Sequence, residues 1–498
     1  MWRGFFKLHS VSSKQGMHIQ IAIRIVGILL MMFSITMLPP VFVSLAYQDG
    51  VTSIFAKAFV VTFVVGFFLW LLFFKNQADM RIKDGFLVTV LFYISLGAFG
   101  ALPFIDEQGL GLSMPDALFE SFSGLTTTGA TVIVGLDELP KSILYYRQQL
   151  QWLGGMGIIV LAVAILPMLG IGGMQLYRAE TPGPVKDSKL TPRIKETAIA
   201  LWSIYLGLTV ACAVAYWGAG MSGFDAICHS FSTIAIGGFS THDGSIGYFD
   251  SWVIEAIAIL FMVLAGINFG LHFFSFKEKS LLHYFRDDEV KFYLSILVAA
   301  TAIVTGVLWY EQTYTFGQAI RFGLFEVVSI FTTTGFSTTD FGTWPNMLPY
   351  LIFFGAFTGA CAGSTGGGMK VIRVMLICKQ GLREVHRLIH PNAVFPVKVN
   401  HRQVSGQIME AVWGFFSIYV IVFLFMQLAL IMTGLDFVTA FSAVGATINN
   451  LGPGLGTVAV HYADISDTAK ILLCFTMALG RLEIFTLLVL FSPMFWRK

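Results

Sequence analysis

The chain has 498 residues, of which 56% are hydrophobic and only 12% are charged, and its formal net charge is +2. Soluble domains carry about 25% charged residues, so this composition excludes an ordinary water-soluble fold and favours a protein whose solvent is the lipid bilayer. The near-neutral charge gives no indication of nucleic-acid binding, and the five cysteines show neither a CxxC pair nor a metal-ligand spacing.

Hydropathy predicts about ten apolar segments long enough, at roughly 20 residues each, to cross the hydrocarbon of a bilayer. The run from Ala58 to Phe74, for example, contains no charged residue. The first segment is too long for the apolar core of a removable signal peptide. In chain order, the segments lie near residues 25–47, 53–74, 85–104, 148–170, 197–217, 252–275, 292–310, 347–377, 408–433 and 467–495.

Shorter, half-polar segments lie between these spans, and at roughly 10–14 residues they are predicted to be re-entrant or interfacial helices. Basic residues concentrate after the second, fourth, sixth and eighth spans and at the end of the chain. The positive-inside rule therefore predicts that both termini are cytoplasmic and that the short segments lie on the outer side. The short segments lie near residues 115–128, 222–236, 317–333 and 436–449.

Each short segment ends in a strip of residues that contains glycine and, in most cases, several serines or threonines. When one glycine from each strip is aligned, a unit of about one hundred residues recurs, with one span, one short helix, one strip and a second span. The strips are SFSGLTTTGATV (Ser121–Val132), SFSTIAIGGFST (Ser230–Thr241), SIFTTTGFSTTD (Ser329–Asp340) and FSAVGATINNLGPG (Phe441–Gly454), and the aligned glycines are Gly129, Gly238, Gly335 and Gly452.

The predicted fold is therefore an all-α integral membrane protein, with four pseudo-repeated helix–pore-loop–helix units around a central pore and two extra N-terminal transmembrane helices. The expected regions are 1–82 (the N-terminal two-helix region), 83–173 (pore repeat 1), 190–280 (pore repeat 2), 288–380 (pore repeat 3, with a broken second helix and a gating loop) and 403–498 (pore repeat 4).

The residue types of the strips fit a path for a monovalent cation. A cation that crosses a membrane exchanges its water shell for fixed oxygens, which backbone carbonyls and uncharged hydroxyls supply, and glycine permits the backbone dihedrals that this requires. One such strip on its own is more simply an ordinary loop turn, whereas four at equivalent places favour a pore. A divalent-cation site would need several carboxylates, and the strips contain almost none.

A glycine-rich break interrupts the eighth span. Five glycines occur between Gly359 and Gly368, and each disfavours a helix by about 1 kcal/mol relative to alanine. We therefore expect a movable gating loop below the strips, and a glycine-rich helix-packing face is the alternative.

Arg481 lies deep in the last span, where an arginine costs roughly 2.5–3.5 kcal/mol, so its side chain is expected to face the pore. The alternative is a salt bridge with Glu483, but residues two positions apart lie on different sides of a helix. Three further polar residues, Glu120, His229 and Glu326, each fall nine positions before an aligned glycine. They are expected either to form hydrogen bonds with strip amides or to pack as ordinary polar residues.

The four strips, together with CAGSTGGGMKVIR (Cys361–Arg373) and LGRLEIF (Leu479–Phe485), resemble the Trk/Ktr/HKT superfamily of K⁺ transport proteins, and within it the bacterial TrkH/TrkG type, over essentially the whole chain. The resemblance implies that the strips form a K⁺ selectivity filter. The implied filter residues are Thr127, Thr128, Gly129, Ile236, Gly237, Gly238, Thr333, Thr334, Gly335, Asn449, Asn450, Leu451 and Gly452. The implied gate residues are Gly359, Ala360, Cys361, Ala362, Gly363, Ser364, Thr365, Gly366, Gly367, Gly368 and Arg481.

Two strips leave alternatives open. The second reads AIGGF and permits a slip of one residue, and we align Gly238 because Phe239 then matches Phe336. The fourth reads NNLGPG where TTTGF would be expected, so the ligand roles of Asn449 and Asn450 stay open.

The resemblance further implies potassium uptake across the bacterial inner membrane through a gated K⁺-selective pore, with the chain as the multi-pass membrane subunit of a Trk-type system. It also implies a homodimer in membrane lipid and a cytoplasmic nucleotide-binding regulator of the TrkA type. The chain has neither a Walker A motif nor a dinucleotide fingerprint, so nucleotide control is expected to come from another subunit. No cofactor and no enzyme activity are expected in this chain, and K⁺ is the transported ion. The alternative is a symporter that couples K⁺ to H⁺ or Na⁺, which needs a second-ion or titratable site near the bilayer midplane.

Overall fold

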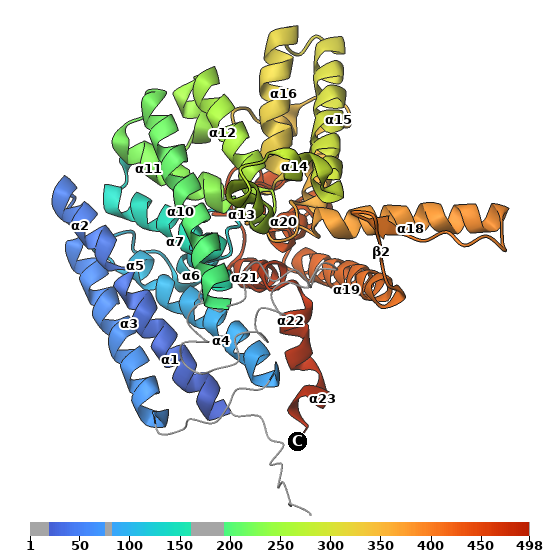
Figure 1. Cartoon of the computed structure of the whole chain (residues 1–498). Coiled ribbons are helices and arrows are strands. Elements are labelled where there is room, and N and C mark those ends of the chain that lie inside the picture. Colours follow the sequence, from blue (N-terminus) through green and yellow to red (C-terminus); the bar gives the residue numbers. More distant parts are fainter. Residues whose placement is uncertain (1–18, 75–81, 161–193, 498) are drawn as a thin grey trace, which may run out of the picture.

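The structure is a computed structural model that describes residues 19–74, 82–160 and 194–497, and helices make up nearly all of it (Figure 1). The predicted all-α class is thereby confirmed. Among the described residues, six helices are long and apolar enough to cross a bilayer, or eight if each of two sharply bent helix pairs counts as one span. The last part of the predicted fourth segment (161–170) and the basic residues from Arg178 to Arg193 lie outside the described residues.

The described elements fall into an N-terminal region and four units that each contain one strip. The N-terminal region consists of α1 (Ile19–Ile35), α2 (Leu38–Tyr47) and α3 (Thr52–Phe73). The first unit contains α4 (Ile82–Gly100), α5 (Leu102–Ile105), α6 (Met114–Leu125), η1 (Leu136–Glu138) and α7 (Lys141–Val160). The second contains α10 (Ile194–Gly218), α11 (Gly223–Ala235), η3 (Ser245–Phe249), α12 (Trp252–Ala265) and α13 (Phe269–Lys277). The third contains α14 (Leu282–Arg286), α15 (Asp288–Tyr310), α16 (Phe316–Phe331), η4 (Phe341–Thr343), α17 (Leu348–Thr358) and α18 (Val371–Ile389). The fourth contains the antiparallel strands β1 (Lys398–Val399) and β2 (Arg402–Gln403), then α19 (Gly406–Ile431), α20 (Phe437–Ile448), η5 (Gly456–Val458), α21 (Asp467–Arg481), α22 (Phe485–Leu488), η6 (Val489–Phe491) and α23 (Pro493–Trp496).

The four predicted short segments are the helices α6, α11, α16 and α20. Three of them begin at a residue whose side chain satisfies a free amide of the first turn, an arrangement worth about 0.5–2 kcal/mol. Ser113, Ser222 and Asp436 accept hydrogen bonds from first-turn amides, and in α16 the side chain of Gln318 accepts one from the amide of Thr315. The sequence therefore fixes where each short helix starts.

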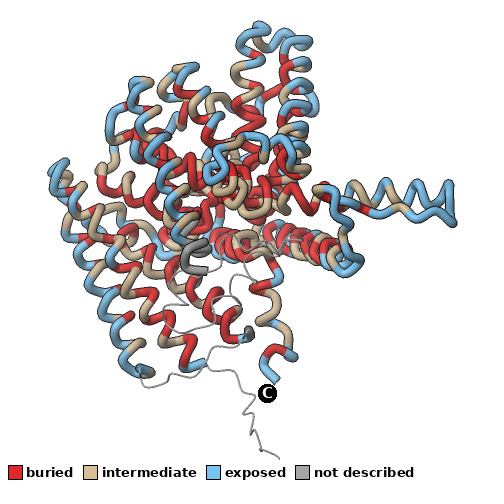
Figure 2. Tube along the Cα trace, viewed as in Figure 1, coloured by how far each residue is buried: buried red, intermediate tan, exposed pale blue. Residues whose placement is uncertain are grey.

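The short helices join the units into a closed ring. The second span of each unit packs against the short helix of the next: α7 against α11, α12 against α16, α17 against α20, and finally α21 against α6. Figure 2 shows that buried residues concentrate in the middle of the molecule, whereas the outer faces of the long helices are exposed. Those faces carry large apolar side chains such as Phe68 and Val298, which are 58% and 69% exposed, as lipid-facing surfaces do.

Three of the predicted spans are not continuous helices. α12 and α13 meet at 94°, and α21 meets the next helical segment at 108°. At the first bend, the side chain of Asn268 caps α13 by accepting a hydrogen bond from Gly270. At the second, Glu483 and Ile484 both adopt a left-handed backbone, with φ of 53° and 55°. The eighth predicted span (347–377) is the last of the three. Its helix α17 ends at Thr358, and the chain becomes helical again at Val371 in α18, which projects away from the other helices (Figure 1).

Candidate functional site

The four strips leave their short helices through the same backbone turn. Two residues before each aligned glycine, the chain adopts a left-handed conformation, and the next amide donates to a helix carbonyl five residues back. The left-handed residues are Thr127, Ile236, Thr333 and Asn450, with φ of 54°, 55°, 67° and 54°. The amide donors are Thr128, Gly237, Thr334 and Leu451, at 2.9, 2.8, 2.8 and 2.8 Å. Because both features recur in register, Gly238 and Gly452 occupy the places equivalent to Gly129 and Gly335.

The aligned glycines meet in a ring. Gly129, Gly238 and Gly335 have left-handed φ values of 81°, 79° and 84°, which side chains rarely tolerate. Each glycine also lies against the backbone of the following strip, and the fourth lies against the first. A Cβ atom added at these positions would lie 2.1 Å from Gly237 O (on Gly129), 2.0 Å from Thr334 O (on Gly238), 3.2 Å from Gly452 N (on Gly335) and 2.7 Å from Gly129 O (on Gly452). The strips that the sequence predicted to converge are thus side by side.

A hollow lies on one side of this ring and is lined by all four aligned glycines and by the loops that follow the strips. In one of these loops His242 stacks on Tyr248, with ring centroids 3.6 Å apart, and its Nδ1 contacts the carboxylate of Asp137. Burial alone would lower the pKa of His242, but the carboxylates of Asp225 and Asp137 outweigh it and raise the pKa above its ordinary value. His242 therefore joins the loops that follow the first and second strips by a partly ionic contact.

The polar residues nine positions before the aligned glycines form hydrogen bonds with residues of their own strips. Glu120 accepts a hydrogen bond from Val132 N at 3.1 Å, and Glu326 accepts one from Thr338 N at 2.7 Å. These two contacts confirm the predicted hydrogen bonds from the short helices to strip amides. His229 differs, because its Nε2 meets the hydroxyl of Ser240 at 2.9 Å rather than an amide.

The glycine-rich loop packs against the strips from the helix side. Its Thr365 hydroxyl donates to Ile234 O at 2.9 Å, and Gly367 N donates to the hydroxyl of Thr333 at 2.8 Å. Gly368 N donates to Asn449 O at 3.0 Å. The loop thus contacts the end of α11 and the third and fourth strips, and its glycines allow this approach: a Cβ atom on Gly367 would lie 2.0 Å from Asn449 O.

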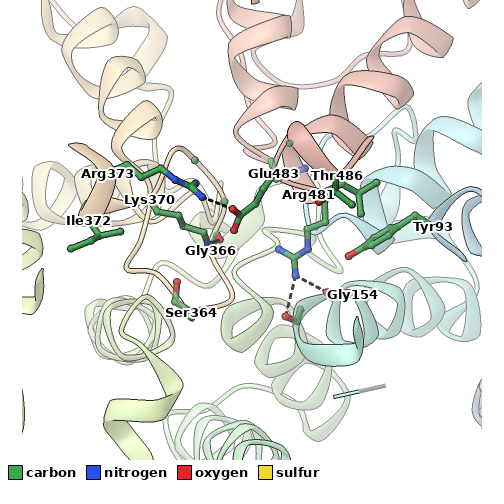
Figure 3. Close-up of a pocket in the computed structure, with 17 residues that line it drawn as sticks. Tyr93, Gly154, Ser364, Gly366, Lys370, Ile372, Arg373, Arg481, Glu483 and Thr486 are labelled. Carbon is green, nitrogen blue, oxygen red and sulfur yellow. Dashed lines mark hydrogen bonds and ion pairs between the residues drawn. The ribbon is translucent and has the colours of Figure 1, made fainter. Parts of the chain in front are cut away.

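Arg481, at the end of α21, joins the loop to the first strip. Its Nη1 donates to the hydroxyl of Thr127 at 3.1 Å and to Thr365 O at 3.0 Å. Its Nη2 donates to the carbonyls of Gly154 and Gly155 in α7, at 2.6 and 3.0 Å (Figure 3). Arg481 is therefore placed directly against a strip, and the alternative contact with Glu483 is absent from its described hydrogen bonds.

Glu483 instead pairs with Arg373 of α18, at 2.5 Å. Both residues line a cavity together with Arg481 and Lys370, whose amine contacts Gly366 O in the loop (Figure 3). Three cationic side chains and one carboxylate thus surround the space beneath the loop, and its net positive charge opposes the entry of cations.

Several functional contacts were not predicted from the sequence. Glu289 of α15 accepts a hydrogen bond from Ala362 in the loop at 2.7 Å. The buried α7 residues Arg147, Gln148 and Gln151 donate to carbonyls of the second strip. The signal available was the run of polar residues inside an apolar span, because such residues are costly unless they have partners. Among the described residues, no group of three or more His, Cys, Asp or Glu side chains is arranged to hold a metal ion.

The comparisons with known proteins agree with one another. The TrkH family model, described as a cation transport protein, matches residues 52–498. The chain is 58% identical, over 97% of its length and 100% of the relative, to the Trk system potassium uptake protein TrkH of Halomonas elongata. It is 54% identical to that of Escherichia coli K12 (97% and 100% covered) and 41% identical to TrkG of the same organism (97% and 99%). The crystal structure of the potassium transporter TrkH from Vibrio parahaemolyticus matches with a TM-score of 0.88 and 53% identity, covering 97% of this chain and 100% of that one. The chain belongs to the TrkH family of cation transport proteins.

Proposed function

We propose that this chain forms a gated pore for potassium uptake across the bacterial inner membrane, as the membrane subunit of a Trk-type system. The observation that carries the proposal is the closed ring of four glycine-bearing strips, in which each aligned glycine lies against the backbone of the next strip. The relatives that are named potassium uptake proteins support the choice of ion.

The proposed filter consists of the strip residues from Thr127, Ile236, Thr333 and Asn449 to the four aligned glycines. Carbonyl and hydroxyl oxygens there replace the water shell of K⁺, and the near-absence of carboxylates holds the ion weakly enough to leave again. The short helices strengthen the site, because the negative ends of α6, α11, α16 and α20 point toward the strips that follow them. The side-chain amide of Asn450 donates to Thr128 and to Met477 O, which favours a structural role for that amide.

The proposed gate is the loop Gly359–Gly368 together with Arg481. In this arrangement the loop and the guanidinium hold the strips from the inner side, and a guanidinium about 4 Å from a K⁺ ion would repel it by roughly 4 kcal/mol at an effective dielectric constant of 20. Opening must break the hydrogen bonds that join the loop and Arg481 to the strips. At about 0.5–1.5 kcal/mol each, the four bonds of Thr365, Gly367, Gly368 and Arg481 total roughly 2–6 kcal/mol. A bound partner typically shifts an equilibrium by about 1–3 kcal/mol, which overlaps the lower part of that range.

The partners and the orientation are proposed on the same basis. The chain forms a homodimer, works with a cytoplasmic nucleotide-binding regulator of the TrkA type and has both termini in the cytoplasm. Its regions are 1–82, 83–173, 190–280, 288–380 and 403–498. The name "Trk system" given to the relatives supports a subunit that works with other components.

Ion flux in liposomes tests the proposal. The full chain is reconstituted with K⁺ on one side and Na⁺ on the other, with and without a candidate cytoplasmic regulator, and the reversal potential is measured. We expect a current that reverses near the K⁺ equilibrium potential and does not shift when a pH gradient is added. A reversal potential that moves with pH would instead favour the symporter, and equal permeation of K⁺ and Na⁺ would contradict the selective pore.

A further inference from the structure

The second strip lacks a side chain that the other strips have. The residues directly before the aligned glycines are Thr128, Gly237, Thr334 and Leu451. Gly237 does not have a left-handed φ, so its backbone conformation does not require glycine. Some other feature of the molecule must occupy the space that a side chain would take.

That space is filled by Gln151 of α7. A Cβ atom on Gly237 would lie 2.4, 2.5 and 2.8 Å from the Cδ, Oε1 and Nε2 atoms of Gln151, and these three are its nearest neighbours. Gln151 itself is completely buried. Glycine at position 237 and glutamine at position 151 are therefore matched to one another.

Gln151 also holds the backbone on both sides of Gly238. Its Nε2 donates to Gly237 O at 2.6 Å, and its Oε1 accepts from Phe239 N at 3.0 Å. The neighbouring Gln148 donates to Phe239 O at 3.1 Å, and Arg147 donates to Ser240 O at 3.2 Å. α7 thus fixes the carbonyls of Gly237, Phe239 and Ser240, on both sides of Gly238, and prevents the one-residue slip that the GG sequence would permit.

The first and third strips achieve a similar result with their own threonines. The hydroxyls of Thr126 and Thr128 lie 2.7 Å apart, and those of Thr332 and Thr334 are paired at the same distance. The second strip has Ala235 and Gly237 at these positions and cannot form such a pair. Gln151 supplies a polar group at this point from a different helix.

We propose that Gln151 is a positioning residue of the filter, which replaces the missing threonine of the second strip and sets the discrimination between K⁺ and Na⁺. This inference rests on the proposed function. The discrimination depends on the number and direction of the oxygens that the ion meets, and a carbonyl held by a buried amide keeps its direction when the ion passes. A change at Gln151 should therefore alter selectivity rather than only the amount of folded protein.

The test is a set of variants measured for the K⁺ to Na⁺ permeability ratio in liposomes. Gln151→Ala leaves Gly237 O and Phe239 N without this partner, and Gly237→Thr drives its side chain into Gln151, so each single variant should lower the ratio. The double variant Gly237→Thr/Gln151→Ala removes the collision and gives the second strip the threonine that stands directly before the aligned glycine in the first and third strips. Its ratio should return to within about threefold of the parent, because effects at contacting sites are not additive.

Gln149→Ala is the matched control. Gln149 lies on the same helix and is also buried, but its amide donates to Thr36 O in the N-terminal region, so the ratio should not change. If Gln151→Ala does not yield folded protein, Gln151→Met keeps the side-chain volume without either hydrogen bond and should show the same loss of selectivity.

Three results would overturn the inference: a parental ratio in a folded Gln151 variant, a double variant no better than the singles, or an equal loss in Gln149→Ala. A failure of the proposed function is distinguishable from these results. In that case the parent chain itself would show no preference for K⁺.

Discussion

At the first three aligned positions glycine is required by backbone conformation and by contact, and at Gly452 by contact alone. At Gly129 the φ of 81° and the carbonyl of Gly237 each exclude a side chain. The first and second strips thus meet without a side chain between them at this point, which is the condition for carbonyl oxygens of different units to face one ion. On the side of the glycine-rich loop, the guanidinium of Arg481 occupies the hydroxyl of Thr127 and the carbonyl of Thr365, so these oxygens are not free to bind an ion.

Gly129→Ser should lower the K⁺ to Na⁺ permeability ratio by about tenfold, since the left-handed conformation alone costs a non-glycine residue roughly 1–2 kcal/mol. The added Cβ atom must also displace Gly237 O, which lies 2.1 Å from its position. Reversal potentials in liposomes measure the ratio. Gly207→Ser on α10, where a Cβ atom meets nothing within 4 Å, is the control and should match the parent. An unchanged ratio in Gly129→Ser would argue against the assigned filter.

At the scale of elements, the glycine-rich loop forms hydrogen bonds with three neighbouring segments. It contacts α11 through Thr365, the third strip through Gly367 and the fourth strip through Gly368. Its other side is held by Glu289 of α15. The loop is largely buried, but the hydrogen bonds that hold it contribute only about 0.5–1.5 kcal/mol each, which suits a gate.

Deletion of Ala362–Gly366 should raise K⁺ flux in the absence of any regulator, by about tenfold or more. The deletion removes the hydrogen bonds of Thr365 to Ile234 O and Arg481, and two such bonds at about 0.5–1.5 kcal/mol each stabilise the closed arrangement. Tracer uptake into liposomes measures the effect. Removal of five exposed residues between α18 and β1, His390–Val394, is the control of equal length. Unchanged or lower flux in a folded loop variant would count against the gate.

The loops that follow the first and second strips are joined through His242, and this contact should depend on pH. Because the folded-state pKa of His242 is raised above its ordinary value of 6.5, the contact stabilises the fold fully below pH 6.5. The stabilisation is lost as the pH rises through the folded-state pKa. The melting temperature should therefore fall from pH 6 to pH 9, and less so in His242→Gln. An identical pH profile for both proteins would refute the ionic contact.

At the scale of the whole molecule, repetition in the sequence was enough to predict the four short helices, the strips and their convergence. Glycine and threonine patterns are local, and so are the N-cap residues that start the helices. The hydrogen bonds from α7 to the second strip were not predictable. Gln151 and Gly237 are distant in the chain, and only the packing of α7 against α11 brings them together. The sharp bend at Glu483 and Ile484 was also missed, since neither residue type marks a left-handed turn.

The ring is closed where the last unit meets the first, and this contact contains an ion pair that should stabilise the whole fold. Lys470 of α21 lies 2.6 Å from Asp116 of α6, and its side chain is only 5% exposed. Removing one member of a buried pair leaves an uncompensated charge and costs roughly 3–5 kcal/mol. Because Asp116 is 23% exposed, Lys470→Ala should destabilise the protein by an amount near the lower end, about 3 kcal/mol.

Thermal unfolding in detergent compares this variant with Lys291→Ala, whose pair with Asp288 is longer, at 3.6 Å, and half exposed on the lysine side. Pairs of that kind contribute about 0.3–0.5 kcal/mol, so the control should melt close to the parent. Since α21 also carries Arg481, loosening its contact with α6 should release the first strip as well as lower the melting temperature. Equal melting of the two variants would mean that packing of apolar side chains, rather than this ion pair, closes the ring.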